Sequence, residues 1–237
     1  MTEYKKKIEL SERLTCVASL VSKGGCVADV GCDHGFVSIF LVQNHLADRV
    51  IAMDVNEGPL ARAKEHVTAY EMEAYIQLRL SDGLKKVSAE DHVDTVVLAG
   101  MGGKLMEKIL SEAMERGLYI PELVLQPQSD LASLRKFLRK AEYTVTEEKM
   151  VLEEGKFYPM MQLRYQAERR TGVDYESEEA DAFGPILMAE KHPLLHEYLL
   201  REIKKFEHVS DEMQRKKSED TAVAQKLAFL KRAESLF

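Results

Sequence analysis

The chain has 237 residues, 45% hydrophobic and 31% charged, which is typical of one folded domain with an appendage rather than of a disordered chain. Asp and Glu (40) outnumber Lys and Arg (33), which gives a net charge of -7. This charge excludes binding to nucleic acid through the overall electrostatic field of the protein, but it does not exclude binding through local basic patches. Three cysteines without a CxxC pair argue against a zinc site or disulfide framework, and neither a secretory signal nor a membrane-spanning apolar run is seen. We therefore expect a cytoplasmic protein with no metal and no membrane association.

Short apolar strands alternate with helices along the first two thirds of the chain. We expect seven strands, at residues 26–30, 49–55, 75–80, 93–99, 122–125, 143–152 and 157–165. We expect helices at residues 10–21, 36–46, 57–70, 104–116 and 129–140, the last one capped by Ser129. Strand–helix alternation predicts a parallel sheet covered on both faces, and the turn at Glu154-Gly155 predicts a closing hairpin. The expected fold is a doubly wound, Rossmann-like α/β sheet.

The last third of the chain has a different composition. Residues 167–182 contain six acids and two bases, which is typical of a solvated connector. From Leu194 onward the apolar residues recur at helical spacing in two stretches, separated by Ser218-Glu219-Asp220, a plausible helix cap. We expect a catalytic domain at residues 1–166, followed over residues 167–237 by a linker and a coiled-coil-like helical hairpin.

The most informative segment is Asp29-Val30-Gly31-Cys32-Asp33-His34-Gly35, at the end of the first strand. Ligands of α/β sheets bind where strand carboxyl ends open at the change of strand order, and glycine allows close approach of the backbone. The spacing matches neither GxGxxG nor the phosphate loop GxxxxGK[ST]. The segment therefore predicts a ligand site that is not built around a pyrophosphate.

Two further acids, Asp54 and Asp82, end the second and third strands. An acid in the place of Asp54 can accept both ribose hydroxyls, and Asp82 can accept an adenine amino proton. Any one of these acids alone can simply begin a solvated loop. Asp29, Asp54 and Asp82 together, at successive strand ends beside a glycine turn, favour a ligand made of a nucleoside and a cationic group. S-adenosylmethionine is such a ligand. The predicted cofactor-binding residues are Asp29, Gly31, His34, Gly35, Asp54, Val55, Asp82, Gly83 and Ala99.

Residues 97–103, Val-Leu-Ala-Gly-Met-Gly-Gly, end the fourth strand. Clustered glycines allow the backbone to approach a flat or reactive group closely. We expect that group to be the methyl acceptor. The alternative is that these glycines only form a tight turn. Gln126, at the end of the fifth strand, has an amide that can read a base edge. Asp33 is the candidate for a polar role at the acceptor. The predicted catalytic residues are Asp33, Gly100, Met101, Gly102 and Gln126.

Five motifs together resemble the bacterial tRNA (adenine-N1)-methyltransferase family that modifies adenine 22. They are Leu-Ser-Glu-Arg-Leu (10–14), Asp-Val-Gly-Cys-Asp-His-Gly (29–35), Ala-Gly-Met-Gly-Gly (99–103), Leu-Gln-Pro-Gln (125–128) and Phe-Gly-Pro (183–185). The resemblance implies a class I methyltransferase fold, S-adenosylmethionine as donor, tRNA as partner and a helical C-terminal domain that helps to hold tRNA. The chain departs from the family pattern in having Asp54, Asp82 and Gln128 where relatives tend to have Glu, Asn and Asn.

Basic clusters give the tRNA partner a candidate surface. The predicted RNA-binding residues are Arg135, Lys136, Arg139, Lys140, Lys204, Lys205, Arg215, Lys216 and Lys217. The first four recur at i and i+4 spacing, which predicts one basic helix face. Two alternatives stay open, a methyltransferase of another substrate and a non-catalytic S-adenosylmethionine sensor whose hairpin dimerises. The sequence leaves the oligomeric state open.

Overall fold

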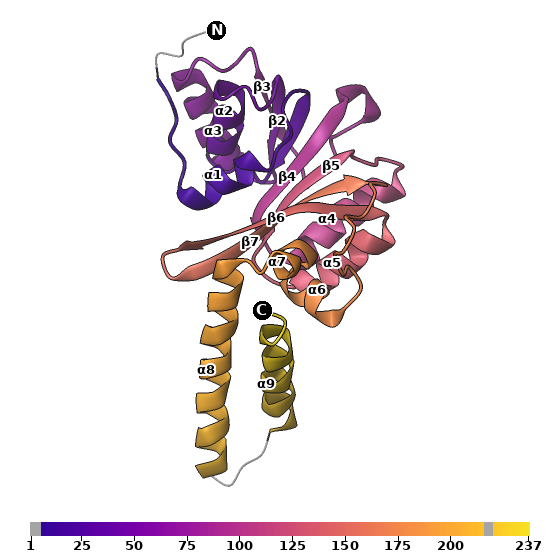
Figure 1. The fold of residues 1–237 in the computed structure, drawn as a ribbon. Helices are drawn as coiled ribbons and strands as arrows, with labels where there is room; N and C mark the ends of the chain where they lie inside the picture. The colour runs from indigo at the N-terminus through magenta and orange to yellow at the C-terminus, as the bar shows by residue number, and fades with distance from the viewer. Residues whose placement is uncertain (1–5, 216–219) are drawn as a thin grey trace. The chain divides into compact units, whose positions relative to one another are not determined.

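The computed structural model describes residues 6–215 and 220–237 and divides the chain into two compact units (Figure 1). Unit 1 comprises residues 1–170 and unit 2 comprises residues 171–237, whereas the sequence predicted a boundary between residues 166 and 167.

Unit 1 is built on one seven-stranded sheet. Its strands are β1 (Cys26–Val30), β2 (Arg49–Asp54), β3 (Ile76–Leu80), β4 (Val93–Met101), β5 (Glu122–Pro127), β6 (Tyr143–Glu153) and β7 (Lys156–Tyr165). The strand order is β3-β2-β1-β4-β5-β7-β6, in which β1 to β5 pair in parallel and β7 is antiparallel to both neighbours (Figure 1). The predicted doubly wound sheet with a closing hairpin is confirmed.

One helix of unit 1 precedes β1, and the others lie between successive strands. These helices are α1 (Glu12–Ser19), α2 (Phe36–Gln43), α3 (Glu57–Ala69), α4 (Gly103–Glu115) and α5 (Leu131–Lys140), together with a short 3-10 turn, η1 (Ala89–Asp91). The prediction that Ser129 caps α5 is wrong. The capping position is Asp130, whose φ is 56°, and the Ser129 hydroxyl instead donates to the Asp130 carboxylate at 2.7 Å.

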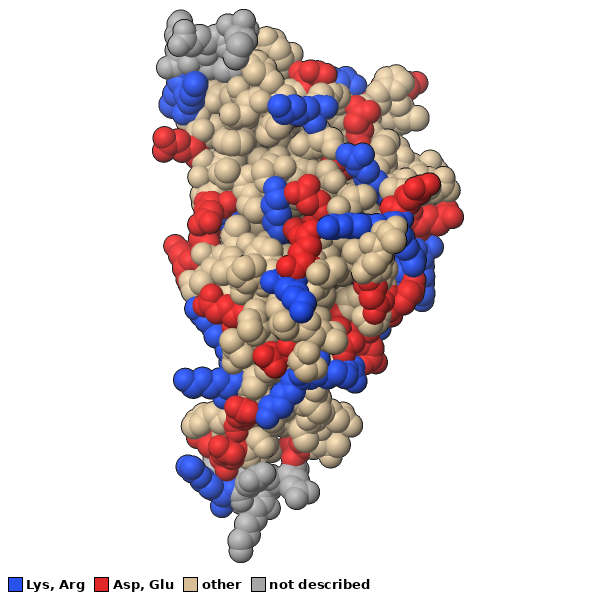
Figure 2. All heavy atoms as spheres, in the orientation of Figure 1, with Lys and Arg blue, Asp and Glu red and all other residues tan. Residues whose placement is uncertain are grey.

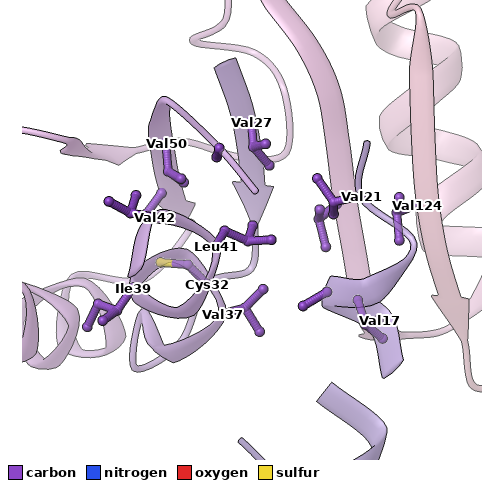
Figure 3. Close-up of a cluster of buried hydrophobic side chains, with 14 of the residues drawn as sticks. Val17, Val21, Val27, Cys32, Val37, Ile39, Leu41, Val42, Val50 and Val124 are labelled. Carbon is purple, nitrogen blue, oxygen red and sulfur yellow. The ribbon is translucent and has the colours of Figure 1, made fainter. Parts of the chain in front are cut away.

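A buried hydrophobic cluster joins helices α1 and α2 to the sheet (Figure 3). Val27 of β1 and Val50 of β2 belong to this cluster together with Val17 of α1 and Leu41 of α2. Cys32, in the turn between β1 and α2, is buried in the same cluster. The apolar core therefore fixes the turn that follows β1, which is the segment with the candidate ligand site.

Unit 2 consists of α6 (Glu178–Phe183), α7 (Pro185–Ala189), α8 (Pro193–Arg215) and α9 (Thr221–Glu234). The predicted helical hairpin is confirmed, since His196 near the start of α8 pairs with Glu234 at the end of α9 at 3.3 Å. Asp220 caps α9 by accepting from the Ala222 N–H at 2.8 Å, whereas residues 218 and 219 of the predicted cap lie outside the described residues.

The prediction of a solvated connector over residues 167–182 is wrong for its second half. Ser177 caps α6 by accepting from the Ala180 N–H at 3.1 Å, and Arg232 of α9 pairs with both Glu178 and Glu179. These ion pairs tie the acid-rich segment to the hairpin. Across the described ranges, no helix has the length and apolar character needed to cross a membrane.

Candidate active site

A cleft of about 340 Å³ opens at the carboxyl ends of β1 and β4. These strands are neighbours, and the chain builds the sheet outward from β1 in one direction and from β4 in the other, so the cleft lies at the topological switch point. Its lining comes from α1, from the turn between β1 and α2, from the start of α2 and from the end of β4: Arg13, Leu14, Asp29, Gly31, Cys32, Asp33, His34, Phe36, Val37, Ala99, Gly100 and Met101. The structure therefore brings together seven of the residues that the sequence predicted for the site.

Asp29 places a carboxyl group in the wall of this cleft. Burial raises the pKa of Asp29 to about 6, and the hydrogen bond that the Ser38 hydroxyl donates at 2.6 Å acts in the opposite direction by favouring the carboxylate. At neutral pH the cleft thus contains a negative charge in poorly solvated surroundings. Such a charge attracts a cationic ligand group.

The glycine turn keeps the floor of the cleft open. Gly31 has a φ of 76°, and a Cβ atom there would overlap the methyl group of Met101 on the opposite wall. The N–H groups of Gly31 and Cys32 donate to the Met53 carbonyl of β2 at 2.8 and 2.9 Å, which anchors the turn to the sheet. Glycine at this position therefore preserves space for a ligand.

His34 brings a buried ring nitrogen to the wall of the cleft. Its Nδ1 atom is buried and has no hydrogen-bond partner within the described residues, although the side chain lines the cleft. Its Nε2 lies 3.5 Å from the Asp33 carboxylate, and its ring stacks on Phe36 at a centroid distance of 5.5 Å. A buried polar atom left unsatisfied favours a bound group that completes it. Together with Asp29 and the open glycine turn, it fits the amino-acid part of S-adenosylmethionine.

Asp54 ends β2, next to the cleft. Its side chain is buried and accepts the N–H of Asn56 at 2.9 Å and that of Asp33 at 3.4 Å, so its carboxylate is held in place. Val55 follows it and is an exposed hydrophobic residue. Neither residue belongs to the lining of the cleft, and their contact with a nucleoside stays a prediction.

Asp82 and Gly83 also lie outside the lining. The Asp82 side chain is 54% exposed and pairs with Lys85, whose hydrogen bond lowers the pKa of Asp82. A Cβ atom on Gly83 would lie 2.9 Å from Ile109 of α4, so this glycine serves the packing of α4. Gly35 likewise packs against Ala63 of α3. The structure gives Gly35 and Gly83 packing roles and leaves the role of Asp82 toward adenine a prediction.

The predicted acceptor side of the cleft is the end of β4, where Ala99, Gly100 and Met101 line it. The pairing of β4 with β5 shifts register between Ala99 and Met101, which makes Gly100 the extra residue of a β-bulge. Gly102 and Gly103 follow outside the lining, and a Cβ atom on Gly103 would lie 2.6 Å from the Ser129 carbonyl. A close approach of two backbones therefore explains part of the glycine cluster.

Gln126 does not face the cleft. Its side chain is fully buried, and its Oε1 accepts from Arg13 Nη1 at 2.8 Å and from the Gly100 N–H at 3.2 Å. The prediction that this amide reads a base edge is wrong, because the amide oxygen is occupied and the side chain is inaccessible.

Arg13 is the charged cleft residue that the sequence reasoning missed. It was visible only as part of the Leu-Ser-Glu-Arg-Leu motif, since the apolar spacing of α1 gives no reason to select it. Four other lining residues were also not predicted: Leu14, Cys32, Phe36 and Val37.

The predicted basic face of α5 is only partly present. The prediction that Arg135 binds RNA is wrong, because its side chain is 3% exposed and its Nη2 pairs with Glu148 of β6 at 3.0 Å. Lys136 and Lys140 are exposed, and Arg139 is half-buried. Arg135 lies on the helix flank that buries Leu134 and Leu138, which places it beneath the face formed by the lysines.

In unit 2 three of the predicted RNA-binding residues lie on α8, namely Lys204, Lys205 and Arg215. Lys204 and Arg215 are exposed, and Lys205 pairs with Glu202 at 3.3 Å, while Lys216 and Lys217 lie outside the described residues. Figure 2 shows basic and acidic side chains interspersed on the visible face rather than segregated into one basic surface. On this face, any RNA-binding surface is therefore local.

The strand order, the switch-point cleft and the acidic glycine turn define a class I S-adenosylmethionine-dependent methyltransferase. The family model described as tRNA (adenine(22)-N(1))-methyltransferase matches residues 27–232, and the chain belongs to this family.

Relatives agree with this membership. The Bacillus subtilis tRNA (adenine(22)-N(1))-methyltransferase is 32% identical over 187 residues, which cover 78% of each chain. A crystal structure of the Bacillus subtilis m1A22 tRNA methyltransferase matches with a TM-score of 0.80 at 28% identity, over 97% of both chains. A candidate tRNA (m1A22) methyltransferase from Streptococcus pneumoniae, in complex with S-adenosyl-L-methionine, matches with a TM-score of 0.82 at 30% identity, over 95% of this chain and 100% of that one.

Proposed function

We propose that this protein transfers a methyl group from S-adenosylmethionine to N1 of adenine 22 in tRNA, as a cytoplasmic enzyme. The observation that carries the proposal is the cleft at the switch point, which Asp29 and His34 line together with the end of β4 at Ala99, Gly100 and Met101. Family membership supports the substrate, and the cleft supports the cofactor.

The chain's residues divide between the two ends of the cofactor. Asp29, Gly31 and His34 would hold the amino-acid part, because they combine negative charge, an open backbone and a buried nitrogen that has no partner among the described residues. Asp54 would accept the ribose hydroxyls, and Val55 would pack against adenine. Asp82 and Gly83, which follow β3, would form one side of the adenine subsite.

The reaction needs little acid–base chemistry from the protein. When bound, S-adenosylmethionine would supply an electrophilic methyl carbon to the neutral lone pair of adenine N1, and its C–S electron pair would leave with the sulfur as S-adenosylhomocysteine. The protein's contribution is orientation, which is worth up to roughly 7–11 kcal/mol of the barrier. We assign orientation of the acceptor base to Gly100, Met101 and Gly102.

Asp33 is the proposed polar group near the acceptor. Its carboxylate lies 3.3 Å from Arg62 Nη2 and 3.5 Å from His34 Nε2, and its side chain is exposed. It can accept a hydrogen bond from the adenine amino group, which becomes more acidic once N1 carries the methyl group. The methylated base can keep its amino protons as a cation, so the step requires a hydrogen-bond acceptor and not a proton acceptor.

Replacing Asp54 with Asn should weaken cofactor binding about 10–100-fold, because a charge-assisted acceptor for the ribose hydroxyls is lost. Asn retains an oxygen that can accept the Asn56 N–H, so the end of β2 should stay folded. Calorimetric titration with S-adenosylmethionine measures the effect. Unchanged affinity would contradict the cofactor assignment of Asp54.

Reversing the charge of Lys136 and Lys140 to Glu should weaken tRNA binding about tenfold and reduce its dependence on salt, because up to two phosphate contacts are lost. Filter binding across a range of salt concentrations measures both quantities, while cofactor affinity should not change. The matched control is Lys64→Glu on the exposed surface of α3. If the double variant and this control behave alike, α5 does not contact tRNA.

Incubation with labelled donor and unmodified tRNA, followed by mapping of the methylated nucleoside, tests the proposed function directly. A tRNA with guanosine in place of adenine 22 should accept no label. Label on protein or on a small molecule would instead indicate a methyltransferase of another substrate. Donor binding without transfer to any acceptor would indicate a sensor.

A further inference from the structure

We infer that Arg13 is a positioning residue for methyl transfer, which fixes the Gly100 bulge at the acceptor side of the cleft through the buried amide of Gln126. This inference rests on the proposed function and adds to it a residue that lies outside both the glycine turn after β1 and residues 99–103 at the end of β4. It joins α1, near the start of the chain, to the end of the fourth strand.

The shared oxygen of Gln126 is the centre of this arrangement. Gln126 Oε1 accepts from Arg13 Nη1 at 2.8 Å and from the Gly100 N–H at 3.2 Å. The amide nitrogen donates to the Pro127 carbonyl at 3.3 Å, which leaves the oxygen pointing toward both donors. Because one donor is a guanidinium, the bond is charge-assisted and shorter than the bond to Gly100.

Gly100 needs this acceptor because it stands outside the strand pairing. Ala99 pairs with Gln126 and Met101 pairs with Pro127, so Gly100 is the bulge residue between two paired positions. Its φ is 76°, in the left-handed region that favours glycine. The three residues 99–101 line the cleft, so the orientation of this bulge sets the wall that the acceptor base meets.

Arg13 is itself held from the other side. Its backbone N–H donates to Glu153 Oε1 at 3.1 Å, its Nε lies 3.6 Å from Glu153 Oε2, and its guanidinium lies 5.3 Å from the centroid of the Tyr158 ring. Its side chain is 21% exposed and lines the cleft. Arg13 therefore uses Nη1 for Gln126 and Nε for Glu153, two donor atoms whose relative geometry the planar guanidinium fixes and a lysine ammonium does not.

The test compares Arg13→Met, Gln126→Met and the double variant in steady-state methylation of tRNA. Each single variant should lower kcat about 10–100-fold, because a misplaced bulge misorients the acceptor. The KM for tRNA and the affinity for S-adenosylmethionine should stay within about twofold, since Asp29, Gly31 and Asp54 are untouched. The double variant should be no slower than the slower single variant, because the two residues act through one bond. Arg13→Lys should recover only part of kcat.

Hydrogen exchange gives a readout without activity. In the cofactor-free protein, the Gly100 amide should exchange faster in both single variants than in the wild type. The matched control is Arg164→Met, which removes an arginine that donates to Ser22 Oγ at 2.8 Å and lies 3.4 Å from Glu122, away from the cleft lining. This control should leave kcat and Gly100 exchange unchanged.

Three results would overturn the inference: multiplicative losses in the double variant, unchanged Gly100 exchange, or a raised KM for tRNA with normal kcat. The last result would mean that Arg13 contacts RNA directly. If the wild-type protein transfers no methyl group to tRNA, the proposed function is refuted. Hydrogen exchange at the Gly100 amide would still test whether Arg13 fixes the conformation of Gly100.

Discussion

Replacing Arg135 with Met is expected to lower the free energy of unfolding by about 3–5 kcal/mol, the range observed when one partner of a buried ion pair is removed. The guanidinium donates through Nε at 3.2 Å and through Nη2 at 3.0 Å to Glu148 Oε1, and the side chains are 3% and 0% exposed. The variant leaves the Glu148 carboxylate without this cation in the interface between α5 and β6. Denaturant unfolding monitored by circular dichroism measures the loss.

The double variant Arg135→Met/Glu148→Leu separates the ion pair from packing. Removing both charges should restore much of the stability, since desolvating the pair costs about as much as the pair contributes. Lys136→Met, one position along the same helix, should change stability by no more than about 0.5 kcal/mol because its side chain is exposed. A single variant Arg135→Met as stable as the wild type would mean that this pair does not hold α5 to β6.

Arg135 also shows where charge patterning fails as a predictor. Spacing at i and i+4 places Arg135 and Arg139 on one side of a helix but does not say whether that side is buried. The partner that decides the question, Glu148, lies on a strand 13 residues further along the chain. By contrast, the exposure of Lys136 and Lys140 follows from their distance from the apolar stripe of Leu134 and Leu138.

The cleft was largely predictable because its residues end parallel strands. Once β1 and β4 are recognised as neighbours, the carboxyl ends of both must meet at one edge of the sheet, which brings Asp29 and Gly31 to Ala99 and Gly100. Arg13 was not predictable in this way. Its partners Gln126 and Glu153 lie 113 and 140 residues away, so only tertiary packing reveals its place.

The sheet itself followed from alternation of short apolar strands and helices, whereas Gln126 shows the limit of that reasoning. Its position at the end of β5 correctly placed it near the cleft, but strand-end position does not distinguish a side chain that faces ligand from one that supports a neighbouring turn. That distinction depends on the β-bulge at Gly100, which has no sequence signature beyond the glycine itself.

Replacing Asp29 with Asn is expected to stabilise the cofactor-free protein at neutral pH while weakening cofactor binding. The pKa of Asp29 rises from its ordinary value of 3.8 to about 6 in the folded protein because of burial. Between these values the unfolded chain has lost the proton that the folded chain retains, so the stability contributed by this group falls as pH rises. Above pH 6 the cost is constant at about 3 kcal/mol, and Asn removes it.

The same linkage makes cofactor affinity depend on pH. A cationic ligand group favours the ionised form of Asp29, so affinity for S-adenosylmethionine should rise as pH increases through about 6 and then level off. In Asp29→Asn the affinity should be about 10-fold or more lower at pH 7.5, because a charged partner is lost, and it should lack this rise. Calorimetric titrations between pH 5 and 8 measure both effects.

His34→Gln is the control for this pH dependence, because His34 is titratable and lines the same cleft. If Asp29 is the group that titrates, this variant should keep the rise in affinity through about pH 6 even where its overall affinity is lower. Should the rise instead disappear in His34→Gln and persist in Asp29→Asn, the charge that governs cofactor binding would belong to the histidine. Asp29 would then serve the turn through its bond with Ser38, at 2.6 Å, rather than through its charge.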